Sequence, residues 1–337
     1  MKYPKNLKDN DRIGIVAPSN GIVKKSKIDA LNKGESNLLK LGFAIDESDD
    51  VRKCKQGVSN DAIYRAHELM SYVKNKNIQC IIAATGGDFL VEILEYLNFN
   101  DILNNIKWVQ GYSDITGLLY VMTVGLDIAT IYSYNITGFG CNHLYESHMN
   151  NINILKGNIV SQRSFELFKE NDSNEQHTVR ELELLRKTYW KTLNKCEKFK
   201  TKGRIIGGCL DCLLDIVGTK FDYTKQFINK YSNDQIVWYF DVSDLTNEDI
   251  LRGLWQLRHA GWFKKTNTIL FGRIKNEISY TGISLNEAIN RGLNNENICV
   301  FTDVNFGHTN PKMTIVNGAI TNIIYNNGKG EILFELQ

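Results

Sequence analysis

The feature that most restricts the fold of this chain is an alternation of short apolar runs with amphipathic segments over its first 130 residues. The apolar runs, rich in β-branched residues, predict strands at 11–18, 42–45, 79–84 and 108–110. Apolar residues at helical spacing predict helices at 25–41, 62–74 and 89–97. Strands that alternate with helices of this length predict a parallel sheet covered by helices on both faces. In such sheets functional groups gather at the carboxyl ends of the strands.

The amino-acid composition of the chain changes after residue 150. A polar stretch at 168–177 and a heavily charged one at 180–202 lie within 151–203. We interpret this segment as a connection in which some strand is expected around 189–190. A second apolar region follows, in which 204–218 predicts a strand, a glycine turn and a helix. Further strands are predicted at 235–242, 268–271, 298–301, 319–325 and 330–334, and a helix at 248–261. The length of 337 residues suggests two domains, which we place at 1–150 and 204–337.

Charge and cysteine content exclude several classes of function. Forty basic residues against thirty-eight acidic ones leave a formal charge of +2, so no strong field favours a nucleic-acid or membrane partner. The first residues lack the apolar stretch of a secretory signal, and no run is apolar enough to predict a membrane-spanning helix. The seven cysteines are scattered and odd in number, which favours reduced thiols and a cytoplasmic location.

The sharpest local motif is Gly-Tyr-Ser-Asp at 111–114. A predicted strand enters it and an apolar helix leaves it, so we expect Ser113 on a tight turn that projects its hydroxyl outward. The Asp114 amide would then point toward an oxyanion formed there. Because the motif lacks the second glycine of the hydrolase elbow and serine is a good helix cap, a capping role for Ser113 stays open on this pattern.

Two further turns carry candidate groups. Thr-Gly-Gly-Asp at 85–88 follows an apolar strand, and paired glycines allow a backbone amide to approach a ligand, although they also serve plain chain reversal. His308 follows Gly307 in a polar turn, and it is either a candidate for proton transfer near neutral pH or an ordinary surface histidine. His143 and His148 compete for the same role.

A carboxylate ends the most apolar strand of the second region. Asp241 follows Trp-Tyr-Phe at 238–240, where an acid that orients a histidine would fit. Asp244 and Glu248 are alternatives, and either could instead start the following helix. A Cys-x-x-Cys pair occupies 209–212, but no second pair completes a zinc site, so we predict no metal and a packing role for both thiols.

Taken in order, these segments resemble the serine peptidase family of L,D-carboxypeptidases, which includes the microcin-immunity hydrolases. The resemblance covers nearly the whole chain. The matching segments are Asp-Arg-Ile-Gly-Ile-Val-Ala-Pro-Ser at 11–19, Ala-Thr-Gly-Gly at 84–87, Gly-Tyr-Ser-Asp-Ile-Thr at 111–116, Gly-Gly-Cys-Leu at 207–210 with Gly-Thr at 218–219, Leu-Trp-Gln-Leu at 254–257 with Ala-Gly at 260–261, and Gly-His-Thr at 307–309. Each motif alone has low specificity, but six in register are not expected by chance.

This resemblance implies a site. Ser113 would be the nucleophile, His308 its general base, and the amides of Gly87 and Asp114 the oxyanion hole. The family's third catalytic residue is a glutamate at the strand end where this chain has Asp241, whose stem is one methylene shorter. A shift of roughly 1 Å in a catalytic group can cost on the order of a hundredfold in rate, so either activity is reduced or the backbone compensates.

The resemblance also implies an architecture and a reaction. The fold class would be α/β, with a flavodoxin-like N-terminal parallel-sheet domain, a smaller β-rich C-terminal α/β domain, and the active site in the cleft between them. The reaction would be hydrolysis of an amide bond next to a free carboxylate, without a cofactor. The substrate would be a small peptide, through the L,D-peptide bond of a murein tetrapeptide in wall recycling, or a peptidyl-nucleotide antibiotic of the microcin C type.

Some expectations concern partners and alternatives. Family members are commonly homodimers, which we expect here. Gly86 and Trp190 are candidates for substrate contacts, Trp190 by stacking on a base, with core packing as its alternative. A catalytically impaired binding module, marked by Asp241, is the main rival. A nucleotide-binding protein that uses 85–88 is a weaker one, because its Gly-x-Gly-x-x-Gly spacing and acidic ribose partner are missing.

Overall fold

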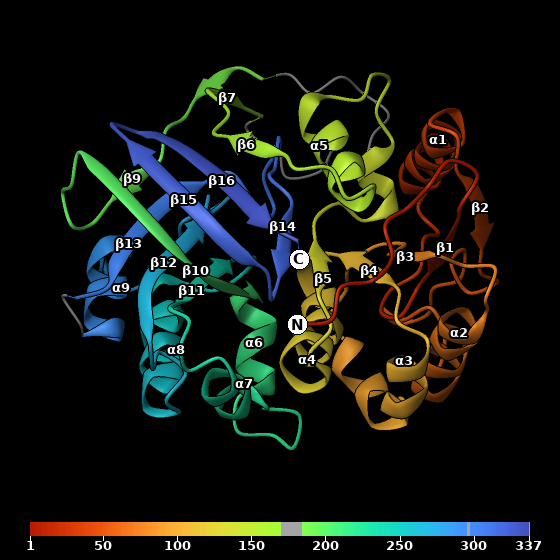
Figure 1. Cartoon of the computed structure of the whole chain (residues 1–337), viewed down its shortest axis with the longest axis horizontal. Helices are drawn as coiled ribbons and strands as arrows, with labels where there is room; N and C mark the ends of the chain where they lie inside the picture. The colour runs from red at the N-terminus through yellow and green to blue at the C-terminus, as the bar shows by residue number, and fades with distance from the viewer. Residues whose placement is uncertain (170–183, 295–296, 337) are drawn as a thin grey trace.

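Two sheets with their covering helices make up the chain and lie side by side (Figure 1). The computed structural model describes residues 1–169, 184–294 and 297–336. Residues 170–183, which belong to the predicted connection at 151–203, therefore lie outside the described residues. The N-terminal half builds most of one sheet and the C-terminal half builds the other, so the fold is α/β with two sheets, as predicted.

The first sheet follows the predicted alternation. Its strand order is β14-β5-β4-β3-β1-β2, and every neighbouring pair is parallel except β14 with β5. The strands are β1 (Arg12–Val16), β2 (Ala44–Glu47), β3 (Cys80–Ala83), β4 (Trp108–Gly111), β5 (Thr130–Tyr132) and β14 (Ile315–Asn317). A strand lies at each of the four predicted places, although β2 begins two residues later than expected.

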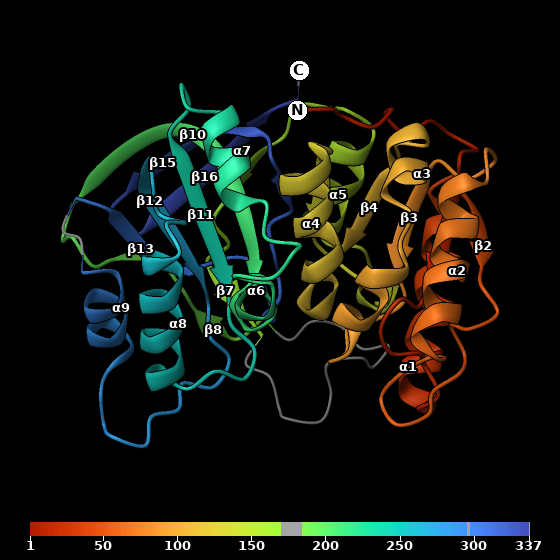
Figure 2. The same cartoon turned by 90° about the horizontal axis from the view of Figure 1, so that it is seen from below.

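Helices cover both faces of this sheet, with α1 and α5 on one side and α2, α3 and α4 on the other (Figures 1 and 2). The α-helices are α1 (Lys25–Lys40), α2 (Ala62–Lys74), α3 (Phe99–Asn104), α4 (Thr116–Leu126) and α5 (Glu146–Leu155). The 3₁₀-helices are η1 (Leu90–Tyr96), η2 (Ser113–Ile115) and η3 (Ile136–Phe139). The helix predicted at 89–97 thus forms with the tighter 3₁₀ winding.

The second sheet has a parallel centre and antiparallel edges, in the order β6-β16-β15-β10-β11-β12-β13-β9. Its strands are β6 (Ser161–Arg163), β9 (Lys191–Thr192), β10 (Lys198–Cys209), β11 (Ile236–Asp241), β12 (Thr266–Gly272), β13 (Cys299–Val304), β15 (Ile320–Asn326) and β16 (Lys329–Glu335). Strands β7 (Leu167–Phe168) and β8 (Arg186–Lys187) pair separately. The helices of this half are α6 (Leu210–Ile216), α7 (Thr224–Lys230), α8 (Asn247–His259) and α9 (Leu285–Leu293).

Strand β10 corrects two expectations. It begins at Lys198, inside the stretch predicted as a connection, because its charged first half pairs with β15 at the surface of the sheet. The glycines predicted to form a turn, Gly207 and Gly208, lie within the strand. A Cβ at Gly207 would collide with the backbone of β11, and a Cβ at Gly208 with Thr116 at the start of α4. The two glycines therefore permit close packing and make no turn.

Helix α4 holds the two sheets together. It is buried along almost its whole length, and its Tyr120 ring stacks on Trp262 at 5.2 Å between ring centroids. Trp262 in turn stacks on Trp238 of β11 at 5.3 Å. Helix α4 is strongly apolar, but it has only 11 residues. Among the described residues, no helix combines the length and the apolar content needed to cross a membrane. The stacked rings fix the N-terminus of α4 at the junction between the sheets.

Strand β14 makes a second connection between the halves. It comes from the segment predicted as the C-terminal domain, yet it pairs antiparallel with β5 and completes the first sheet. Just before β14, the side-chain amide of Gln162 donates to the carbonyl oxygen of Thr314 and accepts from its backbone N–H. The Ser133 hydroxyl lies 2.9 Å from the Thr314 hydroxyl. These contacts hold the loop between β13 and β14 against the carboxyl ends of β4 and β5.

Candidate active site

Ser113 lies on the predicted turn between β4 and α4. Its φ of +64° falls in the left-handed region, which a residue with a Cβ rarely adopts, so the chain turns sharply here. Neither η2 nor α4 begins with a side-chain cap. The Ser113 hydroxyl contacts an imidazole instead, so the geometry favours the outward-facing serine over the capping alternative.

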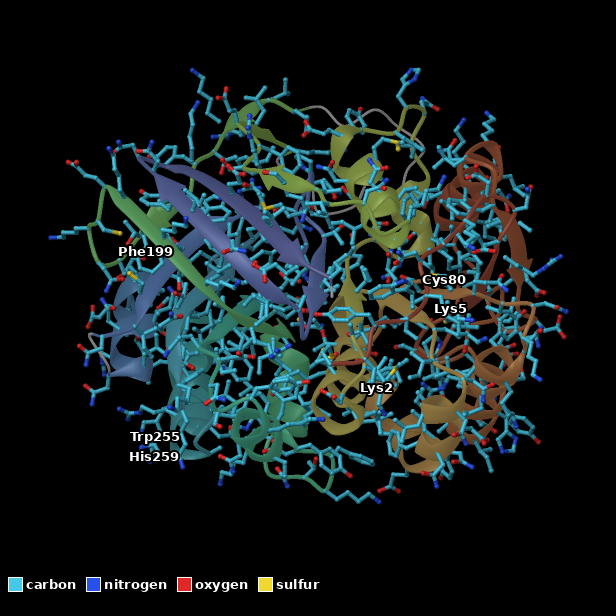
Figure 3. All side chains as sticks on the ribbon, in the orientation of Figure 1. Lys2, Lys5, Cys80, Phe199, Trp255 and His259 are labelled. Carbon is cyan, nitrogen blue, oxygen red and sulfur yellow. The ribbon has the colours of Figure 1, made fainter. Side chains whose placement is uncertain are left out.

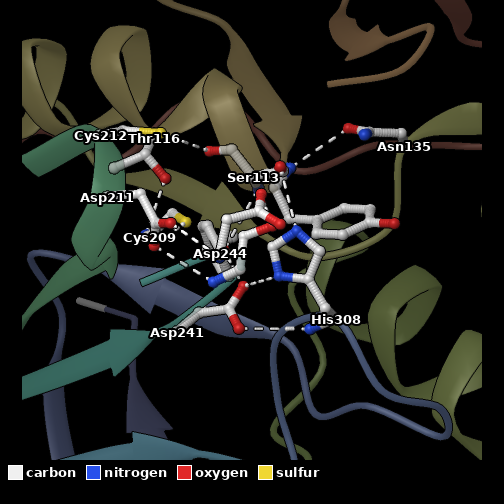
Figure 4. Close-up of polar contacts among 12 residues, drawn as sticks. Ser113, Thr116, Asn135, Cys209, Asp211, Cys212, Asp241, Asp244 and His308 are labelled. Carbon is white, nitrogen blue, oxygen red and sulfur yellow. Dashed lines mark hydrogen bonds and ion pairs between the residues drawn. The ribbon is translucent and has the colours of Figure 1, made fainter. Parts of the chain in front are cut away.

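The three residues named from the sequence meet at the junction of the two sheets (Figure 4). Ser113 Oγ lies 3.1 Å from His308 Nε2. On the other side of the ring, His308 Nδ1 lies 2.7 Å from Asp241 Oδ2. Ser113 begins η2 just after β4, Asp241 ends β11, and His308 is on the loop between β13 and β14. A chain of contacts therefore links hydroxyl, imidazole and carboxylate in the order that a serine hydrolase needs.

Asp241 is fully buried, and its carboxylate is supported by three donors. Besides the imidazole, the backbone N–H of His308 donates to Oδ1 at 3.3 Å, and the hydroxyl of Tyr132 donates to Oδ2 at 2.6 Å. Burial alone would raise the pKa of Asp241, but His308 and the Tyr132 hydroxyl hold it below the ordinary value of 3.8. Asp241 is therefore ionised at neutral pH and can orient the imidazole.

Tyr132 is a functional candidate that the sequence analysis missed. Its hydroxyl donates to Asp241 and accepts the backbone N–H of Ser113 at 3.2 Å, so it joins the serine to the acid across the two sheets. From the sequence, a tyrosine in the apolar run of β5 cannot be distinguished from one that simply packs in the core. No local signal could have identified it, because its partner Asp241 lies 109 residues away along the chain.

The shorter acid at position 241 fits because the loop between β13 and β14 approaches it closely. Gly307 has a φ of +93°, and a Cβ at this position would collide with the Asp241 carboxylate. The glycine thus lets the backbone of the loop come within hydrogen-bonding distance of Asp241, as the contact from the His308 amide shows. The space beside the carboxylate is already filled by the loop and by the Tyr132 hydroxyl.

We therefore expect Asp241→Glu to lower activity, although it restores the family's residue. The additional methylene has no free space and would displace the carboxylate by about 1 Å, which can cost on the order of a hundredfold in rate. The rate at which a serine-reactive phosphonate labels Ser113 measures this effect. Asp244→Glu, the same change at a nearby exposed acid, is the matched control. A labelling rate equal to or above that of the parent chain would contradict the prediction.

Of the residues predicted to contact the substrate or the oxyanion, Gly86 and Gly87 follow β3 and Asp114 follows Ser113 in η2. A Cβ at Gly86 would lie 3.1 Å from Ser113 Oγ and 3.6 Å from the Asp114 nitrogen, so Gly86 faces the nucleophile and needs to be small. The Cα of Gly87 instead packs against Ser19, the residue that ends the first matched motif. Asp114 is the second residue of η2, and the first N–H groups of a helix have no acceptor within that helix. An oxyanion is a suitable acceptor for such a group.

The side chain of Asp114 has a structural role that is separate from the role of its backbone amide. It is buried and accepts hydrogen bonds from the hydroxyl of Ser19 and from the backbone N–H of Leu90, the latter at 2.9 Å. These bonds join the turn that carries Ser113 to the loop after β1 and to the start of η1. Burial, the largest influence, raises the pKa of the Asp114 carboxyl above its ordinary value despite these two donors. The carboxylate positions the turn, and only the backbone amide faces the candidate reaction centre.

The expectation that Trp190 stacks on a substrate base is wrong for this structure. The side chain is 0% exposed, and its indole Nε1 donates to the Asn305 side chain at 2.9 Å. Its ring packs beside Phe301 and against Gly330, where a Cβ would collide with it. The alternative of core packing describes Trp190 instead.

The competing histidine and acids do not join the triad. His148 is buried, stacks on Tyr134, and lies 3.1 Å from the carbonyl oxygen of Gly138. Burial lowers its pKa to about 4, so it stays neutral. Glu248 accepts hydrogen bonds from Ser279 and Thr281, and the carboxylate of Asp244 accepts one from Ser243.

Two other predicted candidates can be placed as well. His143, the second competing histidine, is exposed in the turn before α5. The thiol of Cys212 lies under the turn, 3.7 Å from the carbonyl oxygen of Ser113. Cys209 and Cys212 are both buried, and among residues 1–169, 184–294 and 297–336 no cluster of three or more His, Cys, Asp or Glu side chains could hold a metal.

Comparisons with known proteins show which family and fold this chain is similar to. The family model of the LD-carboxypeptidase N-terminal domain matches residues 13–133 of this chain. The family model of the LD-carboxypeptidase C-terminal domain matches residues 202–323. A Vibrio cholerae protein named as a carboxypeptidase is 24% identical over 337 residues, which cover 97% of this chain and 96% of that protein. The microcin C7 self-immunity protein MccF of Escherichia coli is 28% identical over 276 residues, 78% of this chain and 76% of MccF. A solved MccF-like protein from Bacillus anthracis shares the fold, with a TM-score of 0.82 at 20% identity over 99% of both chains.

Proposed function

The chain belongs to the LD-carboxypeptidase family, and from that premise we propose that it cleaves the L,D-peptide bond of murein tetrapeptides with Ser113 as nucleophile. The observation that carries the proposal is the continuous contact from Ser113 Oγ through the His308 ring to the Asp241 carboxylate. Serine, imidazole and ionised carboxylate in this order are the groups that activate a hydroxyl for acyl transfer.

The reaction then proceeds in two steps. His308 Nε2 takes the proton of the Ser113 hydroxyl as Oγ attacks the carbonyl carbon of the scissile amide. The developing oxyanion accepts from the Asp114 amide and from an amide of the glycine pair at 86–87. The imidazolium gives its proton to the leaving amine, and the C–N bond breaks to leave an acyl-enzyme. A water molecule, deprotonated by His308, hydrolyses the ester and regenerates Ser113.

A direct test is to incubate the purified chain with a murein tetrapeptide and to measure the masses of the products. We expect a tripeptide and one free amino acid from the carboxyl terminus. An unchanged tetrapeptide would contradict the proposed substrate. Labelling by a serine-reactive phosphonate separates this outcome from the binding-module alternative, because a folded protein that resists the label would have no active serine.

A second candidate substrate is a peptidyl or aminoacyl nucleotide. Proteins of the MccF type are similar to this chain over almost its full length, and MccF has been solved in complex with aspartyl sulfamoyl adenosine. The buried Trp190 cannot supply base stacking here, so this candidate needs another aromatic surface. An aminoacyl sulfamoyl adenosine incubated in parallel with the tetrapeptide decides between the two substrates.

Three further parts of the proposal concern the setting of the enzyme. We propose that it acts in the cytoplasm, in the recycling of murein, and as a homodimer. Sedimentation of the purified chain at several concentrations tests the homodimer, and a monomer throughout would contradict it. Accumulation of murein tetrapeptide in cells that lack the chain tests the recycling role.

A further inference from the structure

A buried lysine lies beside the candidate active site, and among the described residues its side chain forms no ion pair. The Lys312 side chain belongs to the same loop as His308 and is 3% exposed. In the part of the chain that the structure describes, its ammonium has neither a hydrogen bond nor an ion pair, and its neighbours are aromatic rings. A buried charge without a partner is costly, so the position is one that an anion from outside the chain would stabilise.

The rings around Lys312 connect it to the triad. Its Nζ lies 3.6 Å from the centroid of the Tyr112 ring and 5.3 Å from that of Tyr134. The Tyr112 ring contacts the His308 ring edge-on, with 5.3 Å between their centroids. Tyr112 directly precedes Ser113, and its ring contacts both the ammonium and the imidazole of the site. These attractive contacts between cation and ring offset part of the cost of burying the charge.

We propose that Lys312 binds the free carboxylate of the substrate's C-terminal residue and thereby selects for carboxypeptidase cleavage. This inference rests on the proposed function. In such a substrate only the amide nitrogen and one α-carbon lie between the scissile carbonyl and the carboxylate. The carboxylate must therefore lie within one residue of Ser113, where a cation on the loop of His308 can reach it. A lysine ammonium is a compact donor that pairs well with a carboxylate.

The charge of this lysine is expected to change near neutral pH. Burial lowers the pKa of Lys312 to about 7, although the charge of Asp241 opposes the shift. Around it, Tyr112 and Tyr134 have raised pKa values, and burial lowers that of His148 to about 4, so all three stay neutral at pH 7. Asp241 stays ionised, and His308 contacts the same Tyr112 ring as the lysine. As the pH rises through 7, Lys312 loses its charge and with it the affinity for a carboxylate.

The test compares a murein tetrapeptide that ends in a carboxylate with the same peptide ending in a carboxamide. For the acid, Lys312→Met should raise KM on the order of 10- to 100-fold, while KM for the amide stays unchanged. Lys312→Arg, which keeps the charge, should restore part of the preference. In the parent chain, the ratio of KM for the acid to KM for the amide should rise above pH 7. Lys156→Met is the matched control, because Lys156 also lies over an aromatic ring, Phe43, but pairs with Asp9 far from the site.

Binding separates this inference from the proposed function. In the Ser113→Ala background, calorimetry should show tighter binding of the acid than of the amide, and adding Lys312→Met should abolish the difference. If neither peptide is hydrolysed but this difference is found, the substrate proposal fails and the role of Lys312 stands. If hydrolysis occurs while Lys312→Met lowers stability without changing the acid-to-amide ratio, the lysine is structural and the inference is overturned.

Discussion

Ser113→Ala is expected to lower kcat by about 10⁴- to 10⁶-fold, the range found when a serine hydrolase loses its nucleophile. Alanine retains the backbone of the turn but removes the hydroxyl that lies 3.1 Å from His308 Nε2. The hydrogen bond from the Ser113 amide to Tyr132 does not involve the side chain and should persist. Activity should therefore disappear while the fold and the affinity for substrate are retained.

Mass analysis of the tetrapeptide products, together with phosphonate labelling, measures the effect of Ser113→Ala. Ser71→Ala is the matched control, because Ser71 is an exposed serine of α2 whose hydroxyl contacts only the carbonyl oxygen of Glu68. It should be labelled and active like the parent chain. If Ser113→Ala still hydrolysed the peptide at a rate within tenfold of the parent, another group would have to be the nucleophile.

Asp241→Asn is expected to lower kcat by roughly 10⁴-fold, as the loss of the triad acid does in other serine hydrolases. Both oxygens of Asp241 accept hydrogen bonds, Oδ2 from Tyr132 and Oδ1 from the backbone of His308, and Oδ2 also faces His308 Nδ1. An asparagine must direct its NH₂ group at one of these donors. The imidazole would then lose either its orientation or the tautomer that leaves Nε2 free to accept the proton of serine.

Asp244→Asn is the control for this variant, since Asp244 was the alternative acid in the sequence and its carboxylate contacts Ser243. It should leave kcat unchanged. Circular dichroism and thermal unfolding of Asp241→Asn show whether the loss of rate reflects the site or the fold. Full activity in Asp241→Asn would show that the carboxylate does not orient the histidine, and equal losses in both variants would point to a general effect of charge.

Much of the fold could be predicted from the sequence because the relevant signals are local. The spacing of apolar residues over 62–74 predicted α2 at its observed bounds, and the apolar run before Gly111 predicted β4. The turn at Ser113 was also accessible, because a strand, a tight turn and a helix follow one another within a few residues. The predictions that failed depend on contacts between residues far apart in the sequence. Gly207 and Gly208 looked like a turn because glycine also fits a turn, whereas the reason for these glycines is close packing against β11 and α4.

The pattern of residues along the chain determined where the helices and strands form and which groups are available for chemistry, because these properties depend on neighbours in the sequence. Only the tertiary structure decided which groups meet. Ser113 and His308 are 195 residues apart, and they come together because β14 returns the C-terminal loop to the first sheet. The same long-range packing placed Tyr132 against Asp241, enclosed Trp190 in the core, and set Lys312 against the Tyr112 ring, with no ion pair among the described residues. Such contacts depend on the shapes of surfaces far apart in the sequence, and no local periodicity records them.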